Sequence, residues 1–315
     1  MKVISFLDNG ERRLGFVAGD EVVDAAAAAL DASSRGYFTD MQSFIRAGDA
    51  GRRAAEQAIK QAPRQARRRL GSVRVLAPLL PSTILCSGSN YTEHNAEKAN
   101  TPISGKEPEF FVMTADNVVG PEDSIVYDPS YTKKLDAETE LAIVIGKEGR
   151  HIARENALDH VFGYTIVNDV TARDLQVRKS PEGSVWYEVG RGKAFDSSAP
   201  LGPVIVTADE IRDPQRLALR TRINGELRQS STTANMIFSC AELIHFFSIG
   251  ITLRPGMVII TGTPGGTAWS NDPELGGKWQ AFPGLVRAER YCMPGDVIEC
   301  EVEGIGVLRN TVAHI

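Results

Sequence analysis

Long uninterrupted apolar stretches are missing from this chain of 315 residues. No window reaches the roughly 18 consecutive apolar residues that a membrane-spanning helix needs. The start, Met1 to Phe6, lacks the apolar core and cleavage site of a signal peptide. The four cysteines are scattered without a C-x-x-C pair, which is typical of reduced thiols, and the net charge of -5 argues against a nucleic-acid partner. We therefore expect a cytoplasmic protein that binds neither membranes nor nucleic acids.

Several common catalytic motifs are also absent. The chain contains no H-E-x-x-H, no G-x-S-x-G and no set of cysteines spaced as zinc ligands. Gly190 to Lys193 resembles half of a phosphate-binding loop, but Ala194 stands where that motif needs Ser or Thr. These absences argue against zinc-protease and serine-triad chemistry.

A small N-terminal α+β domain is predicted for residues 1–75. It opens with a meander of short strands separated by turn residues, and segments 24–32 and 40–70 are predicted to be helical. A proline-punctuated segment follows, so we place a domain boundary there and assign residues 76–315 to a second domain. Its many strands are not separated by regular helices, which predicts a β-rich α+β fold rather than a doubly wound sheet.

A cluster of carboxylates is predicted at the ends of two strands. Glu138 and Glu140 lead into an apolar run, residues 141–145, and both point the same way because alternate residues of a strand share a face. A second run, residues 161–167, delivers Asp169 where that strand should end. Three carboxylates suit a hard cation, Mg²⁺ or Mn²⁺, and leave positions for water and a chelating substrate. Spacing alone leaves open the alternative that Glu138 and Glu140 face solvent on an edge strand.

Four other residues carry chemistry that would complete such a site. His94 and Glu97 stand three apart on a short predicted helix and therefore share a face, where the carboxylate would orient the imidazole as a base. Lys193 would place a cation near developing negative charge, and Thr263 offers a hydroxyl and backbone N–H groups to an anion. Each also has a plainer interpretation, as an exposed helix pair, a surface lysine or a simple turn, and none is decisive singly.

Six motifs occur in a fixed order between Ile84 and Val312. They are Asn90-Tyr91-x-x-His94-x-x-Glu97, Asp136-x-Glu138-x-Glu140, Asn168-Asp169-x-x-Ala172-Arg173-Asp174-x-Gln176, Gly192-Lys193-x-Phe195-Asp196, Thr261-Gly262-Thr263-Pro264 and Gly304-x-Gly306-x-Leu308-x-Asn310. Together these motifs resemble the fumarylacetoacetate hydrolase family. Six motifs in the right order make a far more specific signal than any one of them.

The resemblance implies a fold and a cofactor. The second domain would be a mixed β-sandwich roll of the kind that usually dimerises, so we expect a homodimer. The implied metal is Mg²⁺ or Mn²⁺, with Ca²⁺ able to replace it in crystals, and its ligands would be Glu138, Glu140 and Asp169.

The resemblance also implies roles for individual residues. His94 and Glu97 would activate a water molecule, and Lys193 would stabilise the reacting enolate together with Gln176. The residues implied to bind substrate are Tyr91, Arg173, Gln176 and Thr263, the last of them through the substrate carboxylate.

The implied substrates are 2-oxo or 2,4-dioxo acids. A 2-oxo carboxylate can chelate the open face of the metal, which then stabilises an enolate. We predict a metal-dependent hydrolase that cleaves a carbon–carbon bond of 2,4-dioxo acids such as acylpyruvates and fumarylpyruvate. The alternatives are a 2-oxo acid decarboxylase, or an isomerase or hydratase of unsaturated 2-oxo acids, on the same metal site. A non-catalytic scaffold that has kept the fold would have no need of the His94 and Glu97 pair.

Two positions depart from the family pattern. Met113 stands where many relatives carry a lysine, and Ser89 stands where some carry an arginine. Both changes remove a cation that could bind a carboxylate. We therefore hypothesise a substrate that is less acidic at one end or is anchored differently.

Overall fold

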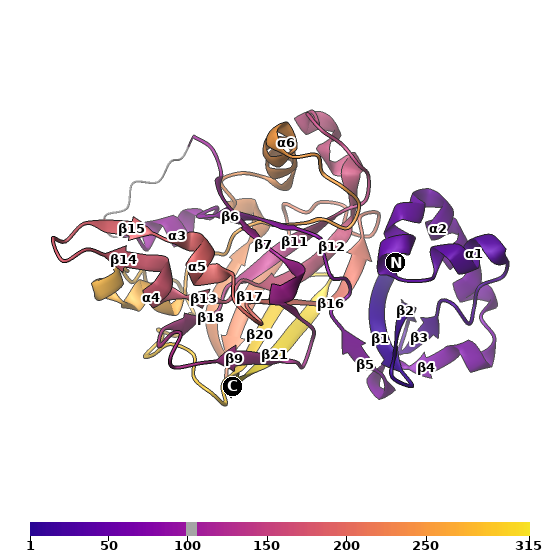
Figure 1. Ribbon diagram of the computed structural model, residues 1–315, viewed down its shortest axis with the longest axis horizontal. Helices are drawn as coiled ribbons and strands as arrows, with labels where there is room; N and C mark the ends of the chain where they lie inside the picture. Colours follow the sequence, from indigo (N-terminus) through magenta and orange to yellow (C-terminus); the bar gives the residue numbers. More distant parts are fainter. Residues whose placement is uncertain (99–105) are drawn as a thin grey trace.

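The structure is a computed structural model that describes residues 1–98 and 106–315 (Figure 1). Most of the loop that the sequence predicts over residues 99–109 lies outside these ranges. Within them, no helix is both long and apolar enough to cross a membrane.

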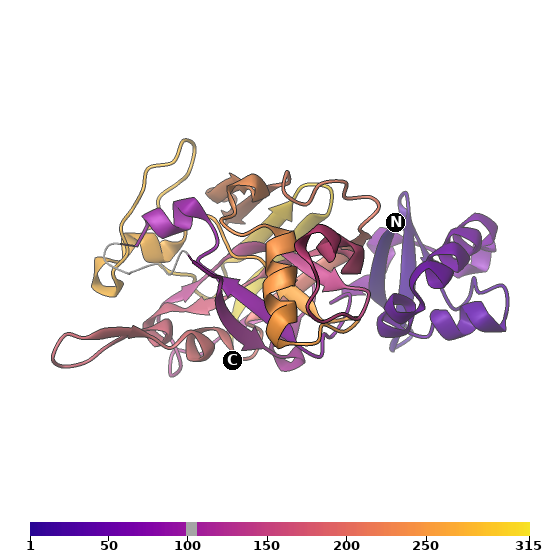
Figure 2. The same ribbon diagram turned by 90° about the horizontal axis from the view of Figure 1, so that it is seen from above.

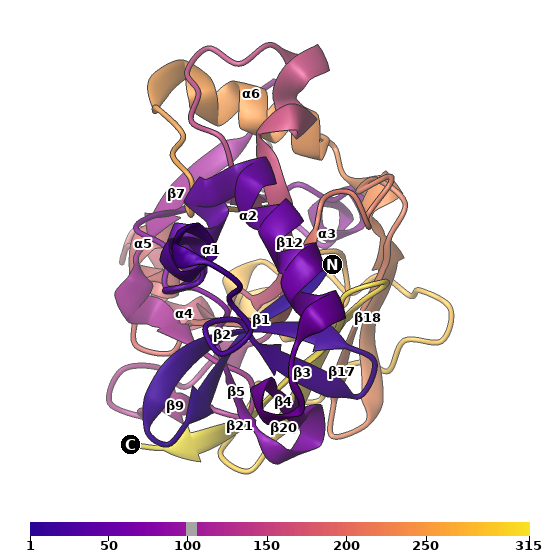
Figure 3. The same cartoon turned by 90° about the vertical axis from the view of Figure 1, so that its right-hand side faces the viewer.

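The N-terminal part begins with the predicted meander. Strands β1 (Lys2–Asp8), β2 (Glu11–Ala18) and β3 (Glu21–Asp24) pair antiparallel in sequence order. Helices α1 (Ala32–Tyr37) and α2 (Met41–Gln61) follow and lie beside these strands (Figure 3). Phe16 of β2 contacts Phe38 and Phe44, with ring centroids 5.2 and 5.4 Å away, so an aromatic cluster joins the helices to the sheet.

Both predicted helices of this part were wrong in their extent. Asp24 ends β3, residues 25–28 form turns, and α1 begins only after Asp31, whose carboxylate accepts a hydrogen bond from Ser34 N. The second helix ends at Gln61, because Pro63 disfavours a helical conformation at the residue before it. The chain then forms β4 (Arg67–Arg69), which pairs with β3.

A 12-stranded sheet runs through both parts of the chain. Its main path is β4-β3-β2-β1-β16-β12-β11-β19-β6-β7, and β5 (Arg74–Leu76) pairs with β1. The bounds beyond β1 are β16 (Ala199–Thr207), β12 (Val161–Asn168), β11 (Thr139–Ile145), β19 (Val258–Ile260), β6 (Ile84–Gly88) and β7 (Glu109–Met113). Because β1 pairs with β16, the strands of residues 1–75 continue the sheet of the second part. The division at residue 75 stays a prediction.

A second sheet of five strands covers one face of the first. Its order is β18 (Glu226–Thr232), β17 (Ala218–Ile223), β20 (Val297–Val302), β21 (Gly306–His314) and β9 (Ser124–Tyr127). Leu141 and Ile143 of β11 share a core with Ile298 and Cys300 of β20, whereas Val144 of β11 faces the other core. Every residue of β11 is consequently buried. The predicted β-rich α+β class, with two sheets packed as a sandwich, is confirmed.

Short elements complete the structure. Helix α6 (Cys240–Gly250) begins at a capping box made by Ser239 and Glu242 and packs against the 3-10 helix η4 (Arg154–His160) (Figure 2). The remaining short strands and helices are β8 (Val118–Val119), β10 (Leu135–Asp136), β13 (Thr171–Ala172), β14 (Val177–Lys179), β15 (Val185–Tyr187), α3 (Thr92–Ala96), α4 (Arg173–Gln176) and α5 (Val189–Lys193). Helices α3, α4 and α5 gather at the end of the sandwich away from the N-terminus (Figure 1).

Candidate metal centre and active site

The antiparallel pairing of β11 and β12 brings the three predicted carboxylates together. Thr139 pairs with Asn168, so Glu138 and Glu140 at the start of β11 lie beside Asp169 at the end of β12. One carboxylate oxygen from each lies within 4.8 Å of the others. All three side chains are buried, at most 3% exposed, so the alternative of a solvent-facing edge strand was wrong.

The carboxylate trio fits a divalent cation. Burial, with Asp169 and Glu138 nearby, raises the pKa of Glu140 well above its usual range, and burial raises the pKa of Asp169 to about 6 although Lys193 opposes the shift. Asp169 Oδ1 is buried and has no hydrogen-bond partner among the described residues. Three hard oxygen donors, one of them with an unpartnered lone pair, are what Mg²⁺ or Mn²⁺ would bind.

Two buried cations hold the trio from one side. Lys193 Nζ at the end of α5 lies 2.5 Å from Glu138 Oε2 and 2.6 Å from Asp169 Oδ2. Arg173 Nη2 donates to Glu138 Oε1, while its Nε donates to Asp136 Oδ2 at 2.9 Å. Burial disfavours the Glu138 carboxylate, but Arg173 and Lys193 outweigh it and lower the pKa of Glu138 to about 2. Glu138 is therefore ionised at every physiological pH.

Asp136 fixes the orientation of Arg173. Its carboxylate accepts backbone N–H groups from Ala268 and Trp269, each at 3.0 Å, besides the bond from Arg173. The Arg173 guanidinium also lies 5.5 Å from the Trp269 ring centroid and donates to Gln176 Oε1. Contacts with Asp136, Gln176, Trp269 and Glu138 thus hold the guanidinium in one orientation.

His94 and Glu97 form a buried pair on the opposite side. His94 Nδ1 lies 3.2 Å from Glu97 Oε2, and Gly266 N donates to Glu97 Oε1 at 2.6 Å. Burial lowers the pKa of His94 to about 3 and raises the pKa of Glu97 to about 8. At neutral pH the imidazole is therefore neutral, the Glu97 carboxyl group is protonated, and the pair has no net charge. The carboxylate that was expected to orient the imidazole is instead protonated at that pH, because burial disfavours its charge.

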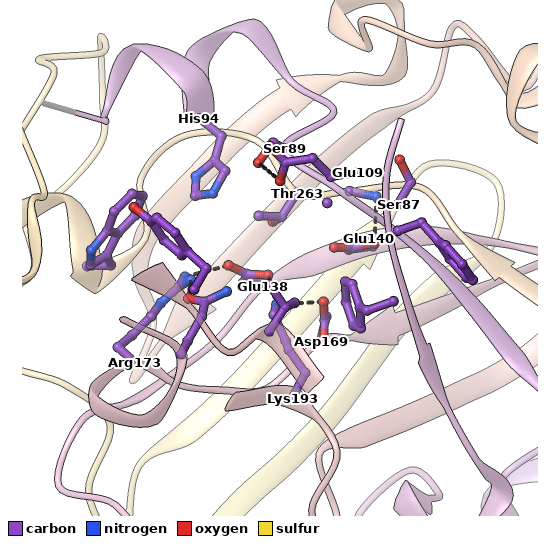
Figure 4. A pocket seen from close by; sticks show the side chains of 18 of the residues that line it. Ser87, Ser89, His94, Glu109, Glu138, Glu140, Asp169, Arg173, Lys193 and Thr263 are labelled. Carbon is purple, nitrogen blue, oxygen red and sulfur yellow. Dashed lines mark hydrogen bonds and ion pairs between the residues drawn. The ribbon is translucent and has the colours of Figure 1, made fainter. Parts of the chain in front are cut away.

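These groups line one cavity of about 380 Å³ (Figure 4). The predicted site residues along its wall are His94, Glu138, Glu140, Asp169, Arg173, Gln176, Lys193 and Thr263. Glu97 lies behind His94, and the His94 ring points toward the carboxylates (Figure 4). Tyr91 is elsewhere: it is fully buried in the hydrophobic core and is not among the described residues that line the cavity.

The loop after β19 supplies another part of the cavity wall. Gly262 N donates to Glu140 Oε2 at 2.6 Å, and Thr263 Oγ1 donates to Thr139 O at 3.0 Å. Gln229 Nε2 in turn donates to Thr263 Oγ1 at 2.9 Å. The Thr263 hydroxyl therefore already donates one hydrogen bond and accepts another. Its role toward a substrate carboxylate stays a prediction.

Sequence reasoning missed several residues of the cavity wall. Lys98, Glu109, Trp269 and Tyr187 line it, and none was predicted to do so. Lys98 stands four residues after His94, a spacing that places side chains near one another at a helix, so this residue could have been found. Trp269 and Glu109 come from segments far away in the sequence, and their approach depends on the tertiary fold.

A family model and several known proteins match this chain. The family model "Fumarylacetoacetate (FAA) hydrolase C-terminal" matches residues 83–313. The chain is 39% identical to the mitochondrial oxaloacetate tautomerase fahd2 of Xenopus laevis, over 99% of this chain and 90% of that one. It is 41% identical to the oxaloacetate tautomerase YisK of Bacillus subtilis (strain 168), over 77% and 74%.

Solved structures that share this fold are named for other activities. The fumarylacetoacetate hydrolase of Exiguobacterium antarcticum is 36% identical with a TM-score of 0.76, and the alignment covers all of both chains. The maleylpyruvate hydrolase of Sphingobium sp. SYK-6, solved with manganese(II) and pyruvate, is 30% identical with a TM-score of 0.75, over 100% of this chain and 99% of that one.

Proposed function

Because this chain belongs to the fumarylacetoacetate hydrolase family of enzymes, we propose that it binds a divalent metal and interconverts the enol and keto forms of a 2-oxo acid. Oxaloacetate is the substrate that this proposal favours, since relatives 39% and 41% identical are named oxaloacetate tautomerases. The predicted carbon–carbon hydrolase becomes the second candidate.

The observation that carries the proposal is the position of the His94–Glu97 pair opposite the carboxylate trio in one cavity. A cation held by Glu138, Glu140 and Asp169 would polarise the 2-oxo group of a chelating acid. A tautomerisation then needs one proton added at the neighbouring carbon and one proton lost from the enol oxygen. The pair holds one proton that it can deliver.

The proton state of the pair favours delivery at neutral pH. With Glu97 protonated, its hydroxyl donates to His94 Nδ1, and the second imidazole nitrogen, Nε2, carries a hydrogen toward the cavity. Transfer from Nε2 to C3 of the enol forms the C–H bond as Nδ1 takes the proton of Glu97. The enol O–H releases its proton to solvent, and Glu97 regains a proton from solvent, so the acid gains and loses one proton and no electron is transferred.

Lys193 and Gln176 would act on the oxygen side. Lys193 is a buried cation among carboxylates, which raise the pKa of its ammonium group although burial opposes them, so it stays charged. A fixed positive charge stabilises negative charge that develops on an enolate oxygen without reorganising. Gln176, held by Arg173, lines the same wall.

Hydrolysis needs the opposite proton state. A water molecule is activated by an unprotonated Nε2, which becomes common only above the pKa of Glu97. The support for this candidate is the fold shared with the two hydrolases at 36% and 30% identity. Oxaloacetate decarboxylation stays a further alternative, and the homodimer and the cytoplasmic location stay predictions, since several relatives are named as mitochondrial.

The test is to follow enol-oxaloacetate by its ultraviolet absorbance, with EDTA and then with Mg²⁺ or Mn²⁺ restored. We expect metal-dependent loss of the enol without release of carbon dioxide. Acetylpyruvate and fumarylpyruvate are assayed alongside for cleavage products. Rapid metal-dependent cleavage of a dioxo acid, with enol conversion at the uncatalysed rate, would replace the tautomerase with the hydrolase.

A further inference from the structure

A lysine outside the family motifs lies in the cavity. Lys98 directly follows Glu97 and lines the same space as the carboxylate trio. Its main chain is fixed, because Lys98 N donates to Asn95 O at 3.2 Å and Lys98 forms a β-bridge with Gly277. The side chain is therefore presented from an anchored position.

Ser89 holds the Lys98 ammonium group. Lys98 Nζ donates to Ser89 Oγ, which donates in turn to Glu109 Oε2 at 2.7 Å (Figure 4 shows the second bond). Asn95 Nδ2 donates to Ser89 O at 2.9 Å and keeps this turn in place. An ammonium group has three N–H donors, so the bond to Ser89 is compatible with further bonds to a ligand oxygen.

The pairing of Lys98 differs from that of the other cations in the cavity. Lys193 and Arg173 both form close ion pairs with Glu138. Among the described residues no ion pair within 4.0 Å includes Lys98, although Glu109 lies close enough for its charge to favour the ammonium form. A largely buried cation without a contacting carboxylate is costly, and an anionic ligand would remove that cost.

We propose that Lys98 binds the second carboxylate of the substrate, at the end remote from the metal, and so determines the preference for an acid that has one. This inference rests on the proposed function, because it names the residue that recognises one end of the same substrate. Ser89 positions the ammonium group for this contact.

Of the two possibilities drawn from Ser89 and Met113, the proposal favours a different anchoring of the substrate. Met113 is fully buried in the core and is not among the described residues that line the cavity. Ser89 has no charge of its own but accepts a hydrogen bond from the Lys98 ammonium group. Lys98 therefore supplies a positive charge beside the position where Ser89 lacks one.

The experiment compares two ligands that differ in one carboxylate. 2-Oxoglutarate and 2-oxopentanoate have the same chain length and the same chelating end, and their binding to the Mn²⁺-loaded enzyme is measured by calorimetry. We expect tighter binding of 2-oxoglutarate to the unmodified enzyme. Lys98→Met should weaken 2-oxoglutarate binding by about 10- to 100-fold, as for a lost charge-assisted hydrogen bond, and leave 2-oxopentanoate unchanged. Lys98→Arg should keep most of the preference.

Lys278→Met is the matched control, because Lys278 is exposed and donates its backbone N–H to Glu97 O in the same corner. It should alter neither affinity. Equal loss of both ligands in Lys98→Met, or no preference in the unmodified enzyme, would overturn the proposal. Binding is measured without turnover, so a failed tautomerase assay leaves this result interpretable. Thermal unfolding of each variant shows that the fold is kept.

Discussion

His94 Nδ1 and Glu97 Oε2 lie 3.2 Å apart in a buried pair. The pKa of the imidazole is about 3 and the pKa of the carboxyl group is about 8, which reverses their usual order. Burial is the main cause of both shifts. The carboxyl group, rather than the imidazole, therefore titrates near neutral pH. The pH dependence of the enzyme consequently reports which reaction it performs.

For a tautomerase that delivers a proton from the pair, kcat should fall as pH rises through about 8, with the slope of a single ionisation. The sign follows from Glu97, whose proton is present below that pH and lost above it. The measurement is kcat for enol-oxaloacetate at saturating metal between pH 6 and pH 10. A rate that instead rises through pH 8 would assign the pair the role of a base and favour hydrolysis.

Replacement of His94 by Gln should lower kcat by about 10²–10⁴-fold, since a positioned acid or base contributes that much, with a smaller change in KM. The amide retains polar contacts of similar size but cannot transfer the proton. Steady-state kinetics with the metal-loaded enzyme measure both constants. A change confined to KM would make His94 a binding residue.

Asp169→Asn should weaken Mn²⁺ binding by at least about 10-fold, because it removes a charge from a buried oxygen donor set. The amide keeps the size of the side chain, so stability should change little. Affinity is measured by calorimetry or by the electron paramagnetic resonance of free Mn²⁺. Glu226→Gln, an exposed change on β18, is the control. Equal affinities in all three proteins would remove Asp169 from the ligand set.

Gly262→Ala should destabilise the protein by about 1–3 kcal/mol, the cost of a strained backbone conformation. Gly262 has φ +88°, and an added Cβ would lie 2.7 Å from Asn90 Cβ. Gly225 has a similar φ of +80° with no atom within 4 Å, so Gly225→Ala separates backbone strain from the clash and should cost less. Urea unfolding measures both. Equal losses of stability would show that Asn90 moves away from the added Cβ at no cost in free energy of unfolding.

Local patterns predicted the parts of the site that lie on regular strands. The alternation of Glu138 and Glu140 and the end of a strand at Asp169 follow from period-two geometry, and the structure brings these residues together. The end of α2 could also have been predicted, because Pro63 disfavours a helical residue before it, whereas the Ala- and Arg-rich composition alone suggested a helix to residue 70.

Long-range contacts could not be predicted from the sequence. Asp136 was recognised as part of a motif, but its bonds to Arg173 and to the backbone of Trp269 link segments 37 and 133 residues apart. The proton state of Glu97 also escaped prediction, because burial depends on residues from the loop at Gly266 and not on its neighbours in sequence.

The pairing of β1 with β16 has a consequence for how the chain can be divided. Val3 and Lys2 pair with Ile205 and Val206 of β16. Without residues 1–75, this side of β16 would be an exposed edge with unpaired N–H and C=O groups, a template for association with other chains. The N-terminal strands therefore cover an edge that could otherwise pair with other chains. The strand that they cover, β16, is the neighbour of β12, and Asp169 lies at the end of β12.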